Sequence, residues 1–179
     1  MTSTTMSGVS ASETTQSIFI TALKNTHALE QEALQIMERQ IERLERYPEM
    51  ADMLRRHVAE TEQQRVRIEE ALHTFGEDRS MLKEAVMGFM GNMAAIAHAP
   101  AGDEILKNTF ANHAFENYEI AAYKSLIAIT EAAGHGKLVT GFQQSLREEE
   151  TMARWIFDNV ETITRKYLSL EERGASGKI

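Results

Sequence analysis

Hydrophobic residues recur at intervals of three and four along four long segments of this 179-residue chain, which is the periodicity of amphipathic α-helices. The segments run from about 18 to 47, from 49 to 75, from 103 to 133, and from a turn at 134–136 to about 169. A shorter, methionine-rich segment at 78–98 does not continue this rhythm. The pattern therefore predicts four long helices and one shorter helix.

The connections between these segments predict how the helices pair. Pro48 separates the first helix from the second, and the glycine-bounded turn at 134–136 separates the third from the fourth. Short connections of this kind join antiparallel neighbours, whereas the connection between the second and third helices is long. Two hairpins joined by a long crossover are the connectivity of a ferritin-like four-helix bundle. We therefore expect an all-α fold of that class.

The two ends of the chain lack the helical pattern. Residues 1–16 contain nine Ser or Thr residues and one charged side chain, Glu13. Residues 171–179 contain two glycines and no periodic apolar positions, and chain ends of this composition are poorly ordered. We expect disordered tails at both ends and the bundle at 17–170.

Composition narrows the function classes. The net charge of −8 argues against a nucleic-acid or anionic-membrane surface, which needs clustered Lys and Arg. No apolar run reaches the roughly 20 residues that cross a bilayer. The chain has no cysteine, which is compatible with a reducing cytoplasm and removes thiolate ligands. Any metal ion must therefore be held by oxygen and imidazole groups, and nothing indicates an organic cofactor.

Glutamates interrupt the apolar faces of the predicted helices, at positions where core residues are expected. Glu149 is the clearest case, and Glu30 and Glu116 take the same kind of position on the first and third helices. Glu60 flanks the apolar face of the second helix, and Gln64 lies one turn further on. Burying one ionised carboxylate costs several kcal/mol, against a net stability of about 5–15 kcal/mol. These residues therefore need a shared compensating charge.

The four glutamates all lie near the midpoints of their helices, so antiparallel packing would bring them to one level. Glu116 and Glu119 are three residues apart and can face one centre together. Carboxylates that bridge two cations are typical of dinuclear Fe or Mn sites in helical bundles. Oxygen-rich ligation favours Mn or Fe over a structural Zn ion.

Three sequence runs resemble the YciE/YciF-like family of ferritin-like bacterial proteins. They are His-Val-Ala-Glu-Thr-Glu-Gln-Gln-Arg-Val-Arg-Ile-Glu at 57–69, Glu-Asn-Tyr-Glu-Ile-Ala-Ala-Tyr at 116–123 and Gln-Ser-Leu-Arg-Glu-Glu-Glu at 144–150. The likeness spans about residues 20–165. It implies a cytoplasmic, often dimeric bundle associated with stress responses, with a dinuclear metal site. The ligand positions it implies are Glu30, Glu60, Glu116, Glu119 and Glu149, with Gln64 and His57 as weaker candidates.

Two features depart from this pattern. Dinuclear bundles carry Glu-x-x-His on two helices, but Gln63 and Met152 stand three residues after Glu60 and Glu149. A carboxylate is frequent in the family four residues after the fourth-helix glutamate, and here that position is Ala153. These departures put in doubt whether the fourth helix completes the metal site.

Histidine instead precedes a glutamate by three residues on three helices, at 27/30, 57/60 and 113/116. This pattern leaves a second interpretation open, in which a buried His–Glu network needs no metal and the protein is a non-catalytic, dimeric helical stress protein. A carboxylate-rich metal site would instead suit catalase-like or ferroxidase-like redox chemistry on peroxide, dioxygen or Fe(II). No residue is assigned a catalytic role. Glu148 and Glu150 are expected to lie on an acidic surface.

Overall fold

The structure is a computed structural model that describes residues 12–77 and 102–177. The described residues form four α-helices and no strand: α1 (Glu13–Ile41), α2 (Pro48–Thr74), α4 (Glu104–Ala132) and α5 (Gly136–Glu172). This confirms the all-α prediction. The shorter helix expected at 78–98 lies outside the described residues.

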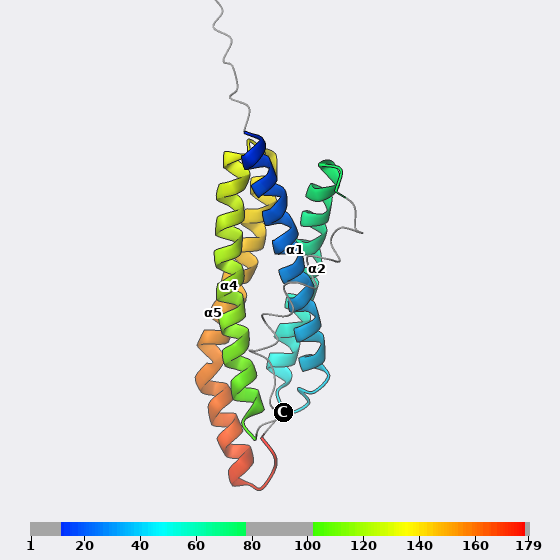
Figure 1. The fold of residues 1–179 in the computed structure, drawn as a ribbon. Helices are drawn as coiled ribbons and strands as arrows, with labels where there is room; N and C mark the ends of the chain where they lie inside the picture. Colours follow the sequence, from blue (N-terminus) through cyan, green and yellow to red (C-terminus); the bar gives the residue numbers. More distant parts are fainter. Residues whose placement is uncertain (1–11, 78–101, 178–179) are drawn as a thin grey trace, which may run out of the picture.

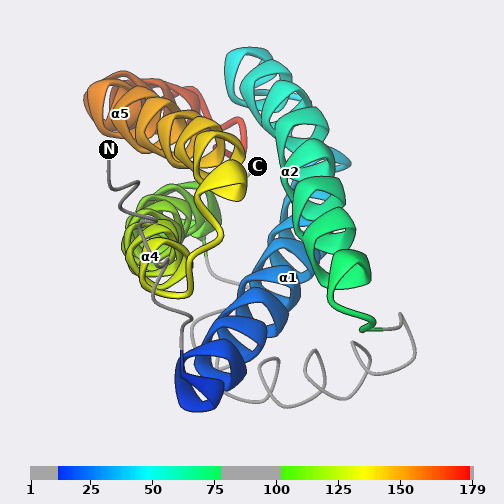
Figure 2. The ribbon, with the colours of Figure 1, turned by 90° about the horizontal axis from the view of Figure 1, so that it is seen from above.

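The helices form two antiparallel hairpins. In Figure 1, α1 runs down and α2 runs up, while α4 runs up and α5 runs down. Around the bundle, α1 packs against α2 and α4, and α5 packs against the same two helices. Figure 2 shows that α2 and α4 are consequently diagonal neighbours. Because α2 and α4 also run in the same direction, the end of α2 and the start of α4 lie at opposite ends of the bundle, as a ferritin-like connectivity requires.

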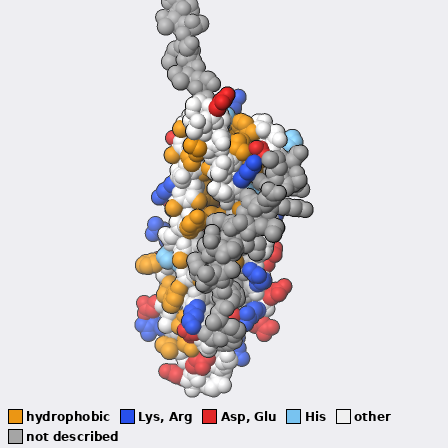
Figure 3. Space-filling view, viewed as in Figure 1, with side chains coloured by type: hydrophobic (Ala, Val, Ile, Leu, Met, Phe, Trp, Pro, Cys, Tyr) orange, Lys and Arg blue, Asp and Glu red, His pale blue; other side chains and the backbone are white. Residues whose placement is uncertain are grey.

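The surface of the described residues carries charges of both signs. Acidic and basic side chains are mixed over the lower half of the face shown in Figure 3, within a chain whose net charge is −8. Among the described residues, no helix contains an apolar stretch long enough to cross a bilayer.

The N-terminal helix boundary differs from the one expected. α1 begins at Glu13 because the Ser12 hydroxyl accepts a hydrogen bond from the Thr15 backbone N–H at 3.1 Å, which caps the helix. Residues 12–16, which we expected to belong to a disordered tail, therefore form the cap and first turn. At its other end α1 stops at Ile41, and turns lead to Pro48 at the start of α2.

The C-terminal residues also depart from expectation. α5 continues to Glu172 instead of ending near 169. The Tyr47 hydroxyl donates a hydrogen bond to the Gly177 carbonyl oxygen at 2.6 Å, and the Gly177 N–H donates to the Glu171 carboxylate at 2.7 Å. Residues 171–177, which we expected to be disordered, therefore return to the bundle because Tyr47 offers them a buried partner.

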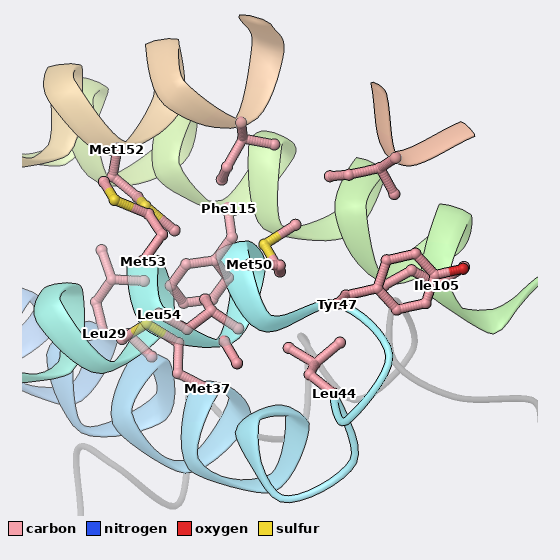
Figure 4. Packing of buried hydrophobic residues seen from close by; sticks show 14 residues of the cluster. Leu29, Met37, Leu44, Tyr47, Met50, Met53, Leu54, Ile105, Phe115 and Met152 are labelled. Atoms are coloured by element: carbon pink, nitrogen blue, oxygen red, sulfur yellow. The ribbon is translucent and has the colours of Figure 1, made fainter. Parts of the chain in front are cut away.

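The core consists of two apolar clusters, one toward each end of the bundle. The first, seen in Figure 4, includes Leu29, Met37, Met50, Leu54, Phe115, Met152 and Ile156. The second includes Phe19, Leu23, Ile68, Leu72, Tyr123, Leu126 and Phe142. On α1, α2 and α4, the residues of one cluster lie on one side of the helix midpoint and those of the other cluster lie on the opposite side, and on α5 the change falls between Phe142 and Met152. The polar residues near the midpoints are thus enclosed between two apolar layers.

The turn between α4 and α5 supplies a test of this architecture. Gly134 has a φ of 81°, a left-handed conformation that disfavours a Cβ atom, whereas Gly136 lies in the first turn of α5 with open space around it. We expect Gly134→Ala to destabilise the protein by about 1 kcal/mol, which lowers Tm by about 2–4 °C in a chain of this size. Calorimetric unfolding provides the measurement.

Gly136→Ala is the matched control, because its backbone conformation suits any L-residue. Its Tm should stay level or rise slightly, since alanine restricts the unfolded chain. Equal losses in both variants would contradict the turn geometry.

Candidate metal centre

Four ionisable side chains meet between the two apolar clusters. His57 comes from α2, Glu116 and Glu119 from α4, and Glu149 from α5, and one ligand atom of each lies within 4.8 Å of the others. All four side chains are buried. Glu116 and Glu119 reach the same point because residues three apart share a helix face. The arrangement collects one imidazole and three carboxylates in a site closed to solvent.

His57 also contacts Glu60, a carboxylate on its own helix that lies outside the group of four. Its Nε2 atom lies 3.2 Å from Glu116 Oε2 and 3.3 Å from Glu149 Oε2, while its Nδ1 atom lies 3.0 Å from Glu60 Oε2. Burial alone would lower the pKa of His57, but Glu116, Glu149 and Glu60 together raise that pKa well above its usual value. In the absence of another cation, the imidazole ring is therefore the positive charge of the group.

Glu30 is a fifth member at the edge of the group. Its side chain is fully buried on α1, and the Tyr123 hydroxyl donates a hydrogen bond to its Oε1 atom. Burial, followed by the charge of Glu149, raises the pKa of Glu30 well above its usual value. Glu30 is thus close enough to interact electrostatically with the group, although it is not among the four whose ligand atoms lie within 4.8 Å of one another.

Several buried carboxylate oxygens in this region lack a hydrogen bond of good geometry. They are Glu30 Oε2, Glu116 Oε2, Glu119 Oε1 and both carboxylate oxygens of Glu149. Glu116 Oε2 and Glu149 Oε2 lie 3.2 and 3.3 Å from one shared nitrogen, His57 Nε2. A buried acceptor without a hydrogen bond costs about 1–3 kcal/mol, and such atoms are normally few. Their collection at one point makes this point suitable for a cation. The donor set therefore fits a metal ion.

The pKa values of the carboxyl groups lead to the same conclusion. Burial raises the pKa of Glu116 to about 8 despite the opposing effect of His57. Burial, with the charges of Glu149 and Glu30, raises the pKa of Glu119 well above its usual value. One imidazolium is too little positive charge for this many carboxylates. Without a further cation, some of these carboxyl groups must hold protons at neutral pH.

The structure brings together most, but not all, of the ligands proposed from the sequence. Glu30, Glu116, Glu119 and Glu149 lie at one level, as their spacing indicated. Glu60 lies outside the group, with its side chain 43% exposed, because it sits on the flank of α2. His57, a weaker candidate on sequence grounds, takes the inward position.

Gln64 and Glu148 belong to a separate contact between α2 and α5. Gln64 is buried and donates a hydrogen bond from Nε2 to Glu148 Oε2 at 3.0 Å. Glu148 also forms a two-point ion pair with Arg67, at 2.8 and 3.2 Å. The expectation of a purely surface position for Glu148 was wrong, because Arg67 and Gln64 reach it across the helix interface. Arg67, one turn after Gln64, was the sequence signal for this contact.

The other histidines do not form the metal-free network that their spacing left open. His27 Nε2 lies 3.0 Å from Glu69 on α2, while Glu30 takes Tyr123 as its partner. His113 Nδ1 lies 3.2 Å from the Ala153 carbonyl oxygen. Of the three His–Glu pairs, only the one at 57/60 forms a hydrogen bond between its own members.

The fold and its buried His–Glu cluster define an all-α protein of the ferritin-like bundle class. Residues 14–169 match the family described as "Domain of unknown function (DUF892)", and the chain belongs to that family. This match covers nearly all of the described bundle.

Solved structures agree with this assignment. A protein from Xanthomonas campestris is 25% identical, with a TM-score of 0.74 over 89% of this chain and 99% of that one. The Escherichia coli stress protein YciF is 21% identical, with a TM-score of 0.66 over 83% and 96%. YcfI from Rhodopseudomonas palustris is 20% identical, with a TM-score of 0.60 over 87% and 97%. The resemblance to YciF-like proteins is confirmed, and the likeness to YciF and YcfI shows the fold alone.

The raised pKa of Glu116 predicts the pH dependence of stability. Its folded value of about 8 exceeds the reference value of 4.5, so the folded protein binds more protons between these values. The free energy of unfolding of metal-free protein should therefore fall as pH rises from about 5 to 8. His57, Glu30 and Glu119 act in the same direction. Urea unfolding of chelator-treated protein at several pH values measures the effect.

Glu116→Gln should flatten this dependence by a few kcal/mol across the same range. Glu150→Gln is the control, because Glu150 is exposed and pairs only loosely with Lys124, at 3.7 Å. A parent protein whose stability is constant or rises over this pH range would contradict the prediction.

Proposed function

We propose that this protein binds two Mn or Fe ions in the buried cluster and carries out redox chemistry on peroxide, dioxygen or Fe(II). The observation that carries the proposal is the convergence of His57 with carboxylate oxygens that have no other partner, in a region enclosed by two apolar clusters. A cation would convert these costly oxygens into ligands.

The donor set suits this choice of metal. Carboxylates and one imidazole are hard or intermediate ligands, which favour Mn and Fe, and the chain offers no thiolate. The carboxylates of Glu30, Glu116, Glu119 and Glu149 carry four negative charges when ionised, which balance the charge of two divalent ions. This charge match supports a dinuclear site over a single ion.

The surrounding residues would hold such a centre in place. Each of the four helices contributes at least one ligand, so bundle packing fixes their relative positions. Glu60 accepts a hydrogen bond from His57 Nδ1 and so directs Nε2 toward the centre. Carboxylates outside the ligand set play this role at many metal sites. Met152, fully buried beside Glu149, helps exclude bulk water. When bound, the metal ions would supply one-electron redox chemistry and Lewis acidity.

We further propose that the protein acts during stress as a homodimer in the cytoplasm. YciF, which shares the fold, is called a stress protein, and the lack of cysteine suits a reducing compartment. Large apolar side chains are exposed at Phe110 and Tyr118 on α4 and at Phe157 on α5, and a second copy would cover them. Light scattering of the purified protein tests the dimer.

A non-catalytic, metal-free bundle is the second candidate. It is favoured by the position of His57 Nε2, within 3.3 Å of two carboxylates, which supplies some compensation without a metal. In that case the remaining carboxyl groups hold protons and the cluster only specifies the packing of the helices. Metal content and activity distinguish the two candidates.

The first test compares neighbouring glutamates on α5. Parent protein reconstituted with Mn(II) or Fe(II) and then desalted should retain about two ions per chain. Glu149→Gln should lose at least half of this metal, because Glu149 is completely buried and its oxygens have no near neighbour of positive charge except His57 Nε2, at 3.3 Å. Glu150→Gln should lose none. Elemental analysis gives the result, and a metal-free parent, or equal content in both variants, would refute the site.

The second test concerns activity. Metal-loaded parent protein should consume hydrogen peroxide, or oxidise Fe(II), faster than the same concentration of metal in buffer, because a carboxylate-rich site stabilises higher oxidation states. Glu149→Ala should abolish this difference. If parent and variant are both folded by circular dichroism and both match free metal, the non-catalytic candidate replaces the redox proposal.

A further inference from the structure

Tyr123 on α4 connects two helices at the edge of the buried cluster. Its hydroxyl donates a hydrogen bond to Glu30 Oε1 on α1. Ser145 on α5 is also fully buried, but its Oγ atom belongs to another contact, in which it accepts a hydrogen bond from Arg67 Nη1 at 3.0 Å. Arg67 also donates to Glu148 at 2.8 Å across the α2–α5 interface.

The direction of this bond follows from the chemistry of the groups. Tyr123 has a single hydroxyl hydrogen, and that hydrogen is donated to Glu30 Oε1. The Ser145 hydroxyl instead donates to the Gly141 carbonyl oxygen of its own helix, at 3.4 Å.

This hydrogen bond makes the two oxygens of Glu30 unequal. Oε1 accepts the hydrogen bond of the Tyr123 hydroxyl, whereas Oε2 is buried and has no hydrogen-bond partner. Tyr123 and Glu30 are both fully buried, so bulk water does not compete for these positions. Oε2 is therefore the oxygen whose lone pairs are both available to a cation.

We propose that Tyr123 is a positioning residue of the metal centre, which reserves Glu30 Oε1 for a hydrogen bond so that Oε2 binds the ion. The inference rests on the proposed metal site and adds a residue that acts through Glu30. It differs from a simple packing role for the tyrosine ring, because the hydroxyl group alone carries the effect.

The test is a titration with Mn(II) alone, followed by the electron paramagnetic resonance signal of the free aqueous ion. Tyr123→Phe keeps the ring and removes the hydroxyl, so it should weaken Mn(II) binding by about 10- to 100-fold, the usual effect of losing a residue that orients a ligand. Tyr118→Phe, an exposed tyrosine on the same helix, is the control and should bind as the parent does.

A double-mutant cycle tests whether the hydroxyl acts through Glu30. If it does, the Tyr123→Phe change should have no further effect in a Glu30→Gln background. The same loss in both backgrounds would show that the hydroxyl acts by a route other than Glu30 and would overturn the proposal. Thermal unfolding of each metal-free variant checks that the bundle remains intact.

The two levels of inference fail differently. A parent that binds no Mn(II) refutes the metal site itself, whereas a parent and a Tyr123→Phe variant that bind equally refute only the positioning role.

Discussion

The need to compensate several carboxylates buried at one level of the bundle is the constraint on which the rest of the structure depends. Glu30, Glu116, Glu119 and Glu149 are all nearly or completely buried, and His57 is the imidazole among them. Each unpaired ion would cost several kcal/mol in such a place, a large share of the roughly 5–15 kcal/mol by which a domain is stable. The fold can hold these carboxylates at one level when protons or metal ions compensate their negative charge. The raised pKa of Glu116 is what compensation by protons predicts.

The apolar clusters on either side make this polar level both possible and useful. Leu54, Met152 and Ile156 close one side, and Leu23, Ile68 and Phe142 close the other. They supply hydrophobic stabilisation that offsets the cost of the carboxylates, and they keep the local dielectric low, so that any charge placed there acts strongly. Metal binding would therefore stabilise the folded protein more here than at an exposed acidic surface.

The sequence predicted the parts of this arrangement that depend on one helix at a time. The apolar spacing located Glu30, Glu116 and Glu149 on inward faces, and Pro48 marked the first hairpin. Contacts between distant segments were not accessible. The return of Gly177 to Tyr47 and the ion pair of Glu148 with Arg67 depend on how helices meet, which periodicity does not encode. On sequence grounds Glu60 ranked above His57 as a ligand, whereas the structure turns His57 inward. Residues three apart differ by only about 60° around a helix, so a small rotation of α2 exchanges them.

That rotation also explains the departure from the Glu-x-x-His pattern. With His57 turned inward, α2 contributes an imidazole to the cluster. Glu60, one turn later, is placed to accept a hydrogen bond from His57 Nδ1. His57, which precedes its glutamate instead of following it, can therefore still serve as a ligand. Glu60 orients the imidazole ring instead of binding the metal itself. On α5 no second side chain takes the place of the frequent carboxylate, since Ala153 is apolar and Met152 belongs to the apolar cluster. The cluster is consequently weighted toward α4, and Glu149 is the single carboxylate that ties α5 to it.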